Sequence, residues 1–368
     1  MPTLVPPLCR PSAPVAPLFQ RRLAPCRPPH SVDSAAGAPS QPIRWRDLSL
    51  SDKLMLLFPL WTFAGAWVAY RHPWTLGFMT RGGGTARFNA SIGLLMLSMG
   101  LSLSKEDFAQ CARRPGLILA GFAAQYGIMP LLGLAIAKAL HLPTSLAVGF
   151  ILLSCCPGGQ VANVAALVGH GDVALSVVQV ALSTLSASIM TPLLTSWLAG
   201  QFVPVSARAL AVSTAKLVLA PTVLGVGLNE LCPALVARLR PAMPLVALSL
   251  SILAISTPVA QVQPVLAAHG ASVLLPVALL HFGGYALGYL LPKLLGARER
   301  PARTISFQTG MQSAALGYGL SVRHFSDPRV AVPSALAIVV MVAIGTALAA
   351  VFRFLPIRDE PRAKRGFS

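Results

Sequence analysis

The chain of 368 residues is 55% hydrophobic and only 11% charged, and its mean hydropathy is +0.68. This balance excludes an ordinary soluble domain and predicts an all-α polytopic membrane protein. A net charge of +18 could suggest a nucleic-acid partner, but basic residues between apolar segments more often set membrane topology. We therefore expect a lipid bilayer and no nucleic acid as the partner of this chain.

Residues 1–43 are predicted to be a leader outside the folded domain. They contain eleven prolines, and four arginines stand against a single acidic residue, Asp33. An arginine-rich, acid-poor and serine-containing N-terminus is typical of an organelle transit peptide, although the prolines weaken an amphipathic helix. The alternative is a disordered cytosolic tail. A secretory leader is not expected because no apolar segment precedes Leu54.

Apolar segments separated by short polar breaks fill residues 44–353, which we predict to be a ten-helix transporter domain, followed by a basic tail at 354–368. A membrane-spanning helix needs about 20 residues. The predicted spans are 54–73, 88–103, 115–137, 145–169, 173–198, 208–231, 243–262, 271–295, 304–323 and 331–352. The second span is short unless it extends into the glycine loop at 82–84.

The distribution of basic residues agrees with an even number of spans. With both termini on one side, that side carries seventeen Lys and Arg residues and the opposite side carries seven. Because the compartment of membrane synthesis keeps the excess of positive charge, both termini are expected on the cytosol-like side. In a plastid that side is the stroma.

Two of the predicted spans, the fourth and the ninth, are interrupted. The fourth contains Pro-Gly-Gly at 157–159, and the ninth contains the amide- and glycine-rich segment 306–313. Proline removes a backbone donor and glycine loosens a helix, so polar backbone groups are freed at bilayer depth, where they must face protein or water. Paired interruptions in corresponding halves are typical of a transporter's binding site.

The position of the interruptions predicts two inverted five-helix repeats. An odd number of helices in each half inverts the second half relative to the first, so the interrupted helices should run antiparallel and cross near the middle of the membrane. Helix ends at such a crossing carry partial charges that can hold a carboxylate or a cation. Amide side chains beside them supply oxygen ligands for a hard monovalent ion.

Several segments of this chain resemble the bile acid:sodium symporter family. They are GLLMLSMGLSLSKEDF (93–108), AQYGIMPLLG (124–133), CCPGGQVANV (155–164), DVALSVVQVALSTLSASIMTP (172–192), LHFGGYALGY (280–289), RTISFQTGMQSAALG (303–317) and HFSDPRVAVPSAL (324–336). The resemblance runs from about Leu54 to Arg353. Together with the leader, it is greatest to the plastid sodium/metabolite cotransporters of plants and algae. It implies a panel domain beside a core domain, and alternating access for an organic anion coupled to sodium.

The resemblance also implies sodium ligands. At the family's first sodium site this chain keeps Asn163 and Ser176, whereas Ala162 and Val180 occupy two other ligand positions. The second site corresponds to Gln125 and the segment 308–312. Gln308 stands there in place of a carboxylate shared by both ions. An amide dipole cannot compensate a desolvated ion as a carboxylate does, so a reduced sodium stoichiometry is expected.

The candidate site residues form two sets. Sodium candidates are Gln125, Asn163, Ser176, Gln308, Thr309, Met311 and Gln312. Candidates for the substrate pathway are Pro157, Gly158, Gly159, Gln160, Ser313 and His281. For His281 the alternative is a neutral, hydrogen-bonded packing histidine.

These observations predict a secondary active transporter in the envelope membrane of a plastid, or alternatively in another cellular membrane. Its substrate would be a small organic anion, such as a 2-oxo acid or monocarboxylate like pyruvate, or a bile-acid-like anion. No cofactor is expected besides a coupling Na⁺. The alternatives are a sodium-independent uniporter, a proton-coupled carrier of the same fold, or a non-transporting relative. An enzyme is not expected, because HExxH, GxSxG and phosphate-loop motifs are absent from the sequence.

Overall fold

The computed structural model of the chain describes residues 57–80, 84–103, 109, 114–239 and 242–357. The predicted leader at 1–43 and most of the predicted tail at 354–368 lie outside these residues. The described part of the chain is helical, apart from loops and one isolated β-bridge. This confirms an all-helical fold.

The first half of the described chain consists of helices joined by short turns and loops. They are α2 (Phe58–Arg71), η2 (Pro73–Leu76), α3 (Gly77–Thr80), α4 (Gly84–Ser102), α6 (Pro115–Ala123), η3 (Ala124–Ile128), α7 (Met129–Ala139), α8 (Thr144–Ser154), α9 (Val161–Val168), α10 (Val173–Leu198) and η4 (Ala199–Gln201).

The second half begins with a helix that contains a π-helical turn and ends with a long apolar helix. Its elements are α11 (Ala207–Thr214), η5 (Ala215–Leu219), α12 (Ala220–Leu231), α13 (Pro233–Leu239), α14 (Met243–Gln261), α15 (Gln263–Leu294), α16 (Glu299–Gly310), α17 (Ala314–His324), η6 (Pro328–Ala331) and α18 (Val332–Phe354).

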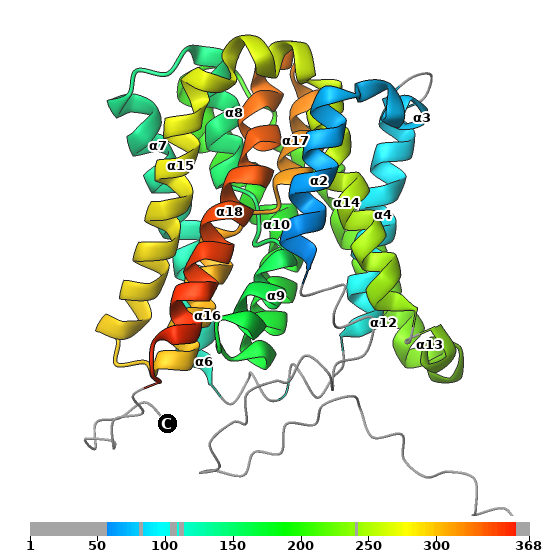
Figure 1. The fold of residues 1–368 in the computed structure, drawn as a ribbon, viewed down its shortest axis with the longest axis vertical. Coiled ribbons are helices and arrows are strands. Elements are labelled where there is room, and N and C mark those ends of the chain that lie inside the picture. The colour runs from blue at the N-terminus through cyan, green and yellow to red at the C-terminus, as the bar shows by residue number, and fades with distance from the viewer. Residues whose placement is uncertain (1–56, 81–83, 104–108, 110–113, 240–241, 358–368) are drawn as a thin grey trace, which may run out of the picture. The chain divides into compact units, whose positions relative to one another are not determined.

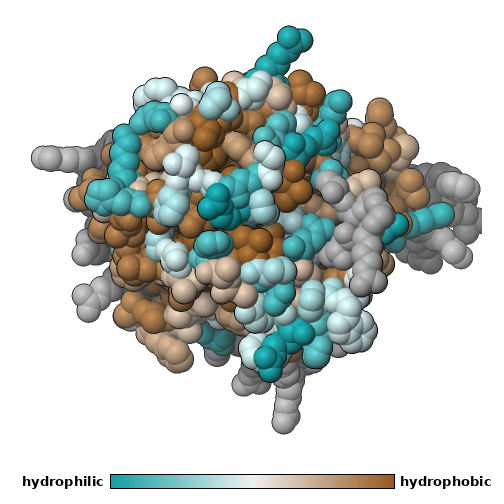
Figure 2. Space-filling model, turned by 90° about the horizontal axis from the view of Figure 1, so that it is seen from above, coloured by the Kyte–Doolittle hydropathy of each residue, from teal (hydrophilic) through white to brown (hydrophobic). Residues whose placement is uncertain are grey.

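Five of the described helical stretches are long and apolar enough to cross a membrane. They are Pro115–Ala139, Val173–Gln201, Ala207–Leu231, Gln263–Leu294 and Pro328–Phe354. Two shorter apolar helices, Thr144–Ser154 and Leu245–Gln261, accompany them. In an end-on view, hydrophilic side chains gather on the face turned to the viewer and apolar residues occupy much of the rim (Figure 2). The composition and length of these helices are those of an integral membrane protein.

The largest difference from the predicted boundaries is at the eighth span. The span expected to begin at residue 271 begins at Gln263, so residues 263–270 are helical and not a loop. Pro264 lies in the first turn of α15, where its missing N–H would have no helical acceptor, and the Leu266 N–H donates to the Val262 carbonyl at 2.7 Å. This proline therefore begins the helix and does not block it.

Two long helices each contain a π-helical turn directly before a proline. In η3 the Met129 N–H donates to the Ala124 carbonyl, and Pro130 follows. In η5 the Ala220 N–H donates to the Ala215 carbonyl, and a proline again follows. A proline removes one helical hydrogen bond and its ring collides with the carbonyl four residues earlier, and the wider turn relieves both problems. Gln125 lies within η3.

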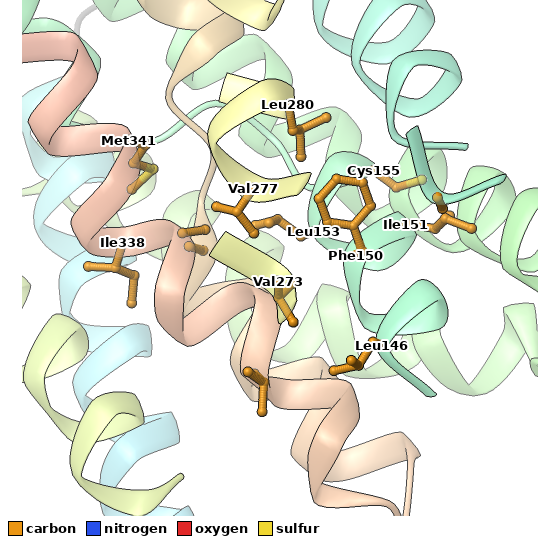
Figure 3. Close-up of a cluster of buried hydrophobic side chains, with 14 of the residues drawn as sticks. Leu146, Phe150, Ile151, Leu153, Cys155, Val273, Val277, Leu280, Ile338 and Met341 are labelled. Atoms are coloured by element: carbon orange, nitrogen blue, oxygen red, sulfur yellow. The ribbon is translucent and has the colours of Figure 1, made fainter. Parts of the chain in front are cut away.

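The interior around the interrupted helices is apolar and closely packed. Phe150 of α8 lies beside Val277 and Leu280 of α15, and Ile338 and Met341 of α18 belong to the same cluster on the other side of α15 in this view (Figure 3). Interior packing of this kind fixes rotamers and backbone positions. On another side, α14 contacts α2 and α4, and α4 contacts α12. The interrupted helices are thus held against a rigid apolar scaffold.

Candidate functional site

The two interruptions lie side by side and are joined by backbone hydrogen bonds. Gly158 and Gln312 form an antiparallel β-bridge. The Gly159 N–H donates to the Met311 carbonyl at 2.7 Å, and the Ser313 N–H donates to the Pro157 carbonyl at 2.8 Å. Backbone groups that the breaks remove from their own helices are thereby satisfied across the crossing, as a membrane interior requires. The predicted interruptions and their meeting are confirmed.

The two interrupted helices run in opposite directions. α8 and α17 lie in the upper part of Figure 1, and α9 and α16 lie in the lower part. The chain therefore descends through the first interruption and ascends through the second. Both α9 and α17 begin at the crossing, with Gln160 and Ser313 as their N-cap residues.

Glycine is required in the first interruption because another side chain approaches the backbone. A Cβ built on Gly158 would lie 2.1 Å from Gln308 Nε2, and one on Gly159 would lie 2.9 Å from the Gln312 carbonyl oxygen. Neither distance is possible for a real Cβ without displacement of the neighbour. The Pro-Gly-Gly segment thus ends α8 and also admits the second interruption.

Buried glutamines connect the crossing to η3. Gln125 Nε2 donates to the Cys156 carbonyl at 2.9 Å and to Gln312 Oε1 at 2.8 Å. Gln312 Nε2 donates to the Thr309 carbonyl at 3.2 Å. The structure therefore brings Gln125, Gln312 and the Thr309 backbone into one network. Buried amides with hydrogen-bond partners on both interruptions fix the geometry of the crossing.

A cavity with an empty volume of about 600 Å³ lies beside the crossing. The side chains that line it are uncharged, and they come from both interruptions, α4, α10, η5, α14 and α18. Candidates for the substrate pathway in its wall are Pro157, Gly158, Gly159, Gln160 and Ser313. The first residues of α9 and α17 also line it, and the positive partial charge at a helix N-terminus favours an anion.

The remaining sodium candidates lie elsewhere or are already engaged. Ser176 Oγ donates to Asn163 Oδ1 at 2.7 Å, so these two side chains form a pair. Ala162 and Val180 are fully buried in an apolar cluster that also contains Met311. The positions that differ from the resembled family are therefore part of the packed interior.

His281 is separated from the other pathway candidates. Its side chain is completely buried, and it lines neither the 600 Å³ cavity nor a smaller cavity of about 190 Å³ whose wall includes Gln125 and Gln308. Its Nδ1 lies 2.8 Å from the Gly310 carbonyl oxygen, at the end of α16. This contact connects α15 to the second interruption and matches the alternative of a packing histidine.

The site residues predicted from the sequence did not include polar side chains of α10 that face the crossing. Thr191 Oγ1 donates to the Cys155 carbonyl at 2.8 Å, and Thr184 lines the 600 Å³ cavity. Gln179 and Ser183 lie next to Gln308 and Gln125 around the smaller cavity. The sequence did contain a signal for two of these residues. Gln179 and Ser183 are four residues apart and so share one face of an otherwise apolar helix.

A helical membrane protein with two interrupted helices that meet beside an uncharged cavity belongs to the class of secondary transporters. Residues 90–269 match the model of the Sodium Bile acid symporter family. This chain belongs to that family, because its similarity to curated family proteins extends over most of its length.

Three relatives illustrate the extent of that similarity. A rice protein named "Probable sodium/metabolite cotransporter BASS2, chloroplastic" is 47% identical over 309 residues, which are 83% of this chain and 73% of the relative. The Arabidopsis thaliana protein named "Probable sodium/metabolite cotransporter BASS1, chloroplastic" is 37% identical, over 80% of this chain and 73% of its own. A Bacillus subtilis protein named "Uncharacterized sodium-dependent transporter YocS" is 39% identical, over 67% and 76% respectively.

Proposed function

We propose that this protein carries a small organic anion, of the 2-oxo acid or monocarboxylate class, across a plastid envelope membrane in symport with sodium. The proposed architecture is the ten-span arrangement of two inverted repeats, with a panel domain and a core domain. It is a carrier and not an enzyme. The opposite directions of the two interrupted helices support the inversion (Figure 1).

One observation carries the proposal. Two helix N-termini, those of α9 and α17, open onto the 600 Å³ cavity, and the side chains around it are uncharged. Their partial positive charges can bind a carboxylate without a full buried cation. The cavity also lies between the interruptions and α4 and α14, so movement between these groups would change access to it.

The proposed sodium stoichiometry is lower than two. Gln308 is a neutral amide, and Ala162 and Val180 lie in an apolar cluster, so three positions lack the ligands that the resemblance implies for two ions. A desolvated cation without a full countercharge is costly, and each missing ligand raises that cost. Coupling to one sodium ion is therefore the expected arrangement.

The plastid location rests on the arginine-rich leader and on the relatives whose printed names contain "chloroplastic". Fusion of residues 1–43 to a fluorescent protein tests it. Import of the fusion into isolated chloroplasts is the expected result. Retention of the fusion in the cytosol would contradict the plastid location while leaving the transport proposal intact.

Transport is tested with the purified full chain in liposomes. Uptake of labelled pyruvate and other 2-oxo acids is measured with and without an inward sodium gradient. Sodium-driven uptake with first-order dependence on sodium is expected. Second-order dependence would overturn the reduced stoichiometry, and no flux of any monocarboxylate would favour the non-transporting alternative.

The neutral amide at Gln308 favours a second candidate, a uniporter or proton-coupled carrier of the same fold. A sodium ionophore and a protonophore distinguish it from the symporter. Collapse of uptake with the sodium ionophore alone supports the symporter. Collapse with the protonophore alone, or no response to either, supports the second candidate.

A further inference from the structure

Basic side chains gather at the end of the molecule where α16 begins. The start of α16 and the ends of α9 and α18 lie at the lower end of the molecule in Figure 1. Arg300 is the second residue of α16, Arg353 lies in the last turn of α18, and His170 lies in the loop after α9. The two arginines are exposed and the histidine is half-buried. These three residues are called the basic patch below.

A buried arginine of α16, Arg303, positions the three segments of the patch relative to one another. Its Nη1 donates to the Gly169 carbonyl at 3.3 Å and to the Phe352 carbonyl at 2.6 Å. Gly169 directly precedes His170 in the chain. Phe352 directly precedes Arg353. The backbone beside two members of the patch is therefore held by a side chain that is only 1% exposed.

The positive charge of the patch is not neutralised by the described part of the protein. Neither Arg300 nor Arg353 has an ion-pair partner among the described residues. Glu299 lies in the same helical turn as Arg300, but its carboxylate accepts from Arg303 Nε at 2.9 Å and from Lys293 Nζ at 3.3 Å. Two cations already share this carboxylate, so it cannot compensate the patch as well.

The charges around His170 are close enough to affect one another. Burial, and then the charges of Arg353, Arg303 and Arg300, lower the pKa of this histidine below its usual value of 6.5. The position of Arg300 adds a second cost, because the N-terminus of a helix carries a positive partial charge. A bound oxyanion would relieve both costs, and guanidinium groups match the geometry of phosphate oxygens.

Exposed apolar side chains next to the patch indicate which oxyanion it meets. Phe354 follows Arg353 at the end of α18 and is 86% exposed, and Leu294, the last residue of α15, is 83% exposed. The contact of Lys293 with Glu299 places the end of α15 beside the first turn of α16. Apolar groups of this size are favourable among acyl chains and unfavourable in water. A lipid supplies both a charged headgroup and acyl chains, whereas a free anion supplies only the charge.

We propose that the basic patch binds the phosphate group of an anionic lipid through Arg300 and Arg353, at the membrane surface where α16 begins. The imidazole of His170 supplies one further hydrogen-bond donor. Arg303 is a positioning residue, because its guanidinium is already engaged with Glu299 and backbone carbonyls. No residue of the patch lines the 600 Å³ cavity, so this inference goes beyond the proposed transport function and does not depend on it.

Thermal unfolding of the purified full chain in an uncharged detergent tests the proposal. The protein is titrated with phosphatidylglycerol, with the zwitterionic phosphatidylcholine as the lipid control and with sodium phosphate as the free anion. Saturable stabilisation by phosphatidylglycerol alone is the expected result. Equal stabilisation by phosphatidylcholine would overturn the charge-based site. Sodium phosphate that stabilises as well as phosphatidylglycerol would assign the patch to a free anion and overturn the lipid.

Two substitutions locate the binding of phosphatidylglycerol. Arg300→Gln and Arg353→Gln each remove one charge from an exposed side chain, so both variants should fold. Each should raise the apparent Kd for phosphatidylglycerol about fivefold, which corresponds to about 1 kcal/mol, the contribution of one basic residue near an anionic surface. The affinity for phosphatidylcholine should not change in either variant.

Arg208→Gln is the matched control for these variants. Arg208 is also exposed, is also the second residue of its helix, α11, and has no ion-pair partner in the described part of the chain. Its substitution should leave the apparent Kd for phosphatidylglycerol at the wild-type value. A rise as large as that in Arg300→Gln would show attraction by net charge alone and overturn the assigned site. An unchanged Kd in both Arg300→Gln and Arg353→Gln would overturn it as well.

Discussion

Gln308 and Gly158 are in direct contact across the crossing, and the carboxamide of Gln308 occupies the space in which a side chain at position 158 would begin. The calculated distance from a Gly158 Cβ to Gln308 Nε2 is 2.1 Å. Gly158 also forms the β-bridge to Gln312. A single glycine therefore positions both interruptions and the amide that replaces the resembled family's carboxylate.

Gly158→Ala should lower stability and abolish transport. The added methyl group must displace Gln308 or separate the interruptions, and overpacking of this kind costs about 1–3 kcal/mol. Thermal unfolding and liposome uptake measure the two effects. Gly227→Ala is the control, because no atom lies within 4 Å of its Cβ position in α12 and alanine favours helix. Equal behaviour of the two variants would contradict the proposed contact.

Gln308→Glu should strengthen sodium dependence. The carboxylate would face the oxygens of Gln125 and Gln179 in a buried site, so the variant should be less stable than wild type without sodium and should recover when sodium is added. Unfolding temperature as a function of sodium concentration is the measurement. Gln201→Glu, at an exposed position, should show the wild-type response. A Gln308→Glu titration that overlays the wild-type curve would exclude this electrostatic explanation.

Arg303→Met should strongly destabilise the core. Arg303 is buried, its Nε contacts Glu299 Oε1 at 2.9 Å, and its guanidinium donates to the Phe352 carbonyl at 2.6 Å and the Gly169 carbonyl at 3.3 Å. It thereby holds the ends of α9 and α18 together. Loss of one partner of a buried ion pair costs about 3 kcal/mol or more.

The comparison for Arg303 is an exposed ion pair. Arg114 Nη1 lies 3.0 Å from Asp172 Oδ2, and its side chain is 60% exposed. Arg114→Met should change stability by less than about 1 kcal/mol, because water screens such pairs. A similar drop in unfolding temperature in both variants would show that Arg303 does not act through its buried contacts.

His170 should make stability depend on pH. It lies in the loop between α9 and α10, where burial, followed by the charges of Arg353, Arg303 and Arg300, lowers its pKa below the usual 6.5. The unfolded chain then binds the proton more readily, so stability is full above pH 6.5 and falls as pH drops below it. His170 has a φ of 56°, which asparagine tolerates. His170→Asn should reduce the slope of unfolding temperature between pH 7 and about pH 5. An unchanged slope would assign the pH dependence to other groups.

Periodicity and composition were sufficient to predict the long apolar helices but not every boundary. The span at 173–198 coincides with α10, since Asp172 caps that helix by accepting from the Leu175 N–H at 3.1 Å. The predicted loop at 263–270 is helical, because a proline can either begin or end a helix and local sequence does not distinguish the two cases. The π-helical turns before Pro130 and Pro221 were also not predictable from periodicity.

The crossing was predictable, whereas the pairing of particular side chains was not. Interruptions in corresponding spans of the two halves predicted that the segments meet, and the structure brings Gln125 and Gln312 within hydrogen-bond distance. Gln179 was not predicted as a site residue, because it lies within a hydrophobic segment and its neighbours are set by tertiary packing. His281, chosen for its chemistry, instead contacts a carbonyl at the end of α16.

The backbone bridge between the interruptions has a mechanical consequence. Since Gly159 is bonded to Met311 and Ser313 to Pro157, neither broken helix can slide along its axis without rupturing bonds to the other. We therefore expect the two interruptions to move together. A solute bound at the bridge would cross the bilayer when the bridged interruptions move, and the bridge itself would not rearrange.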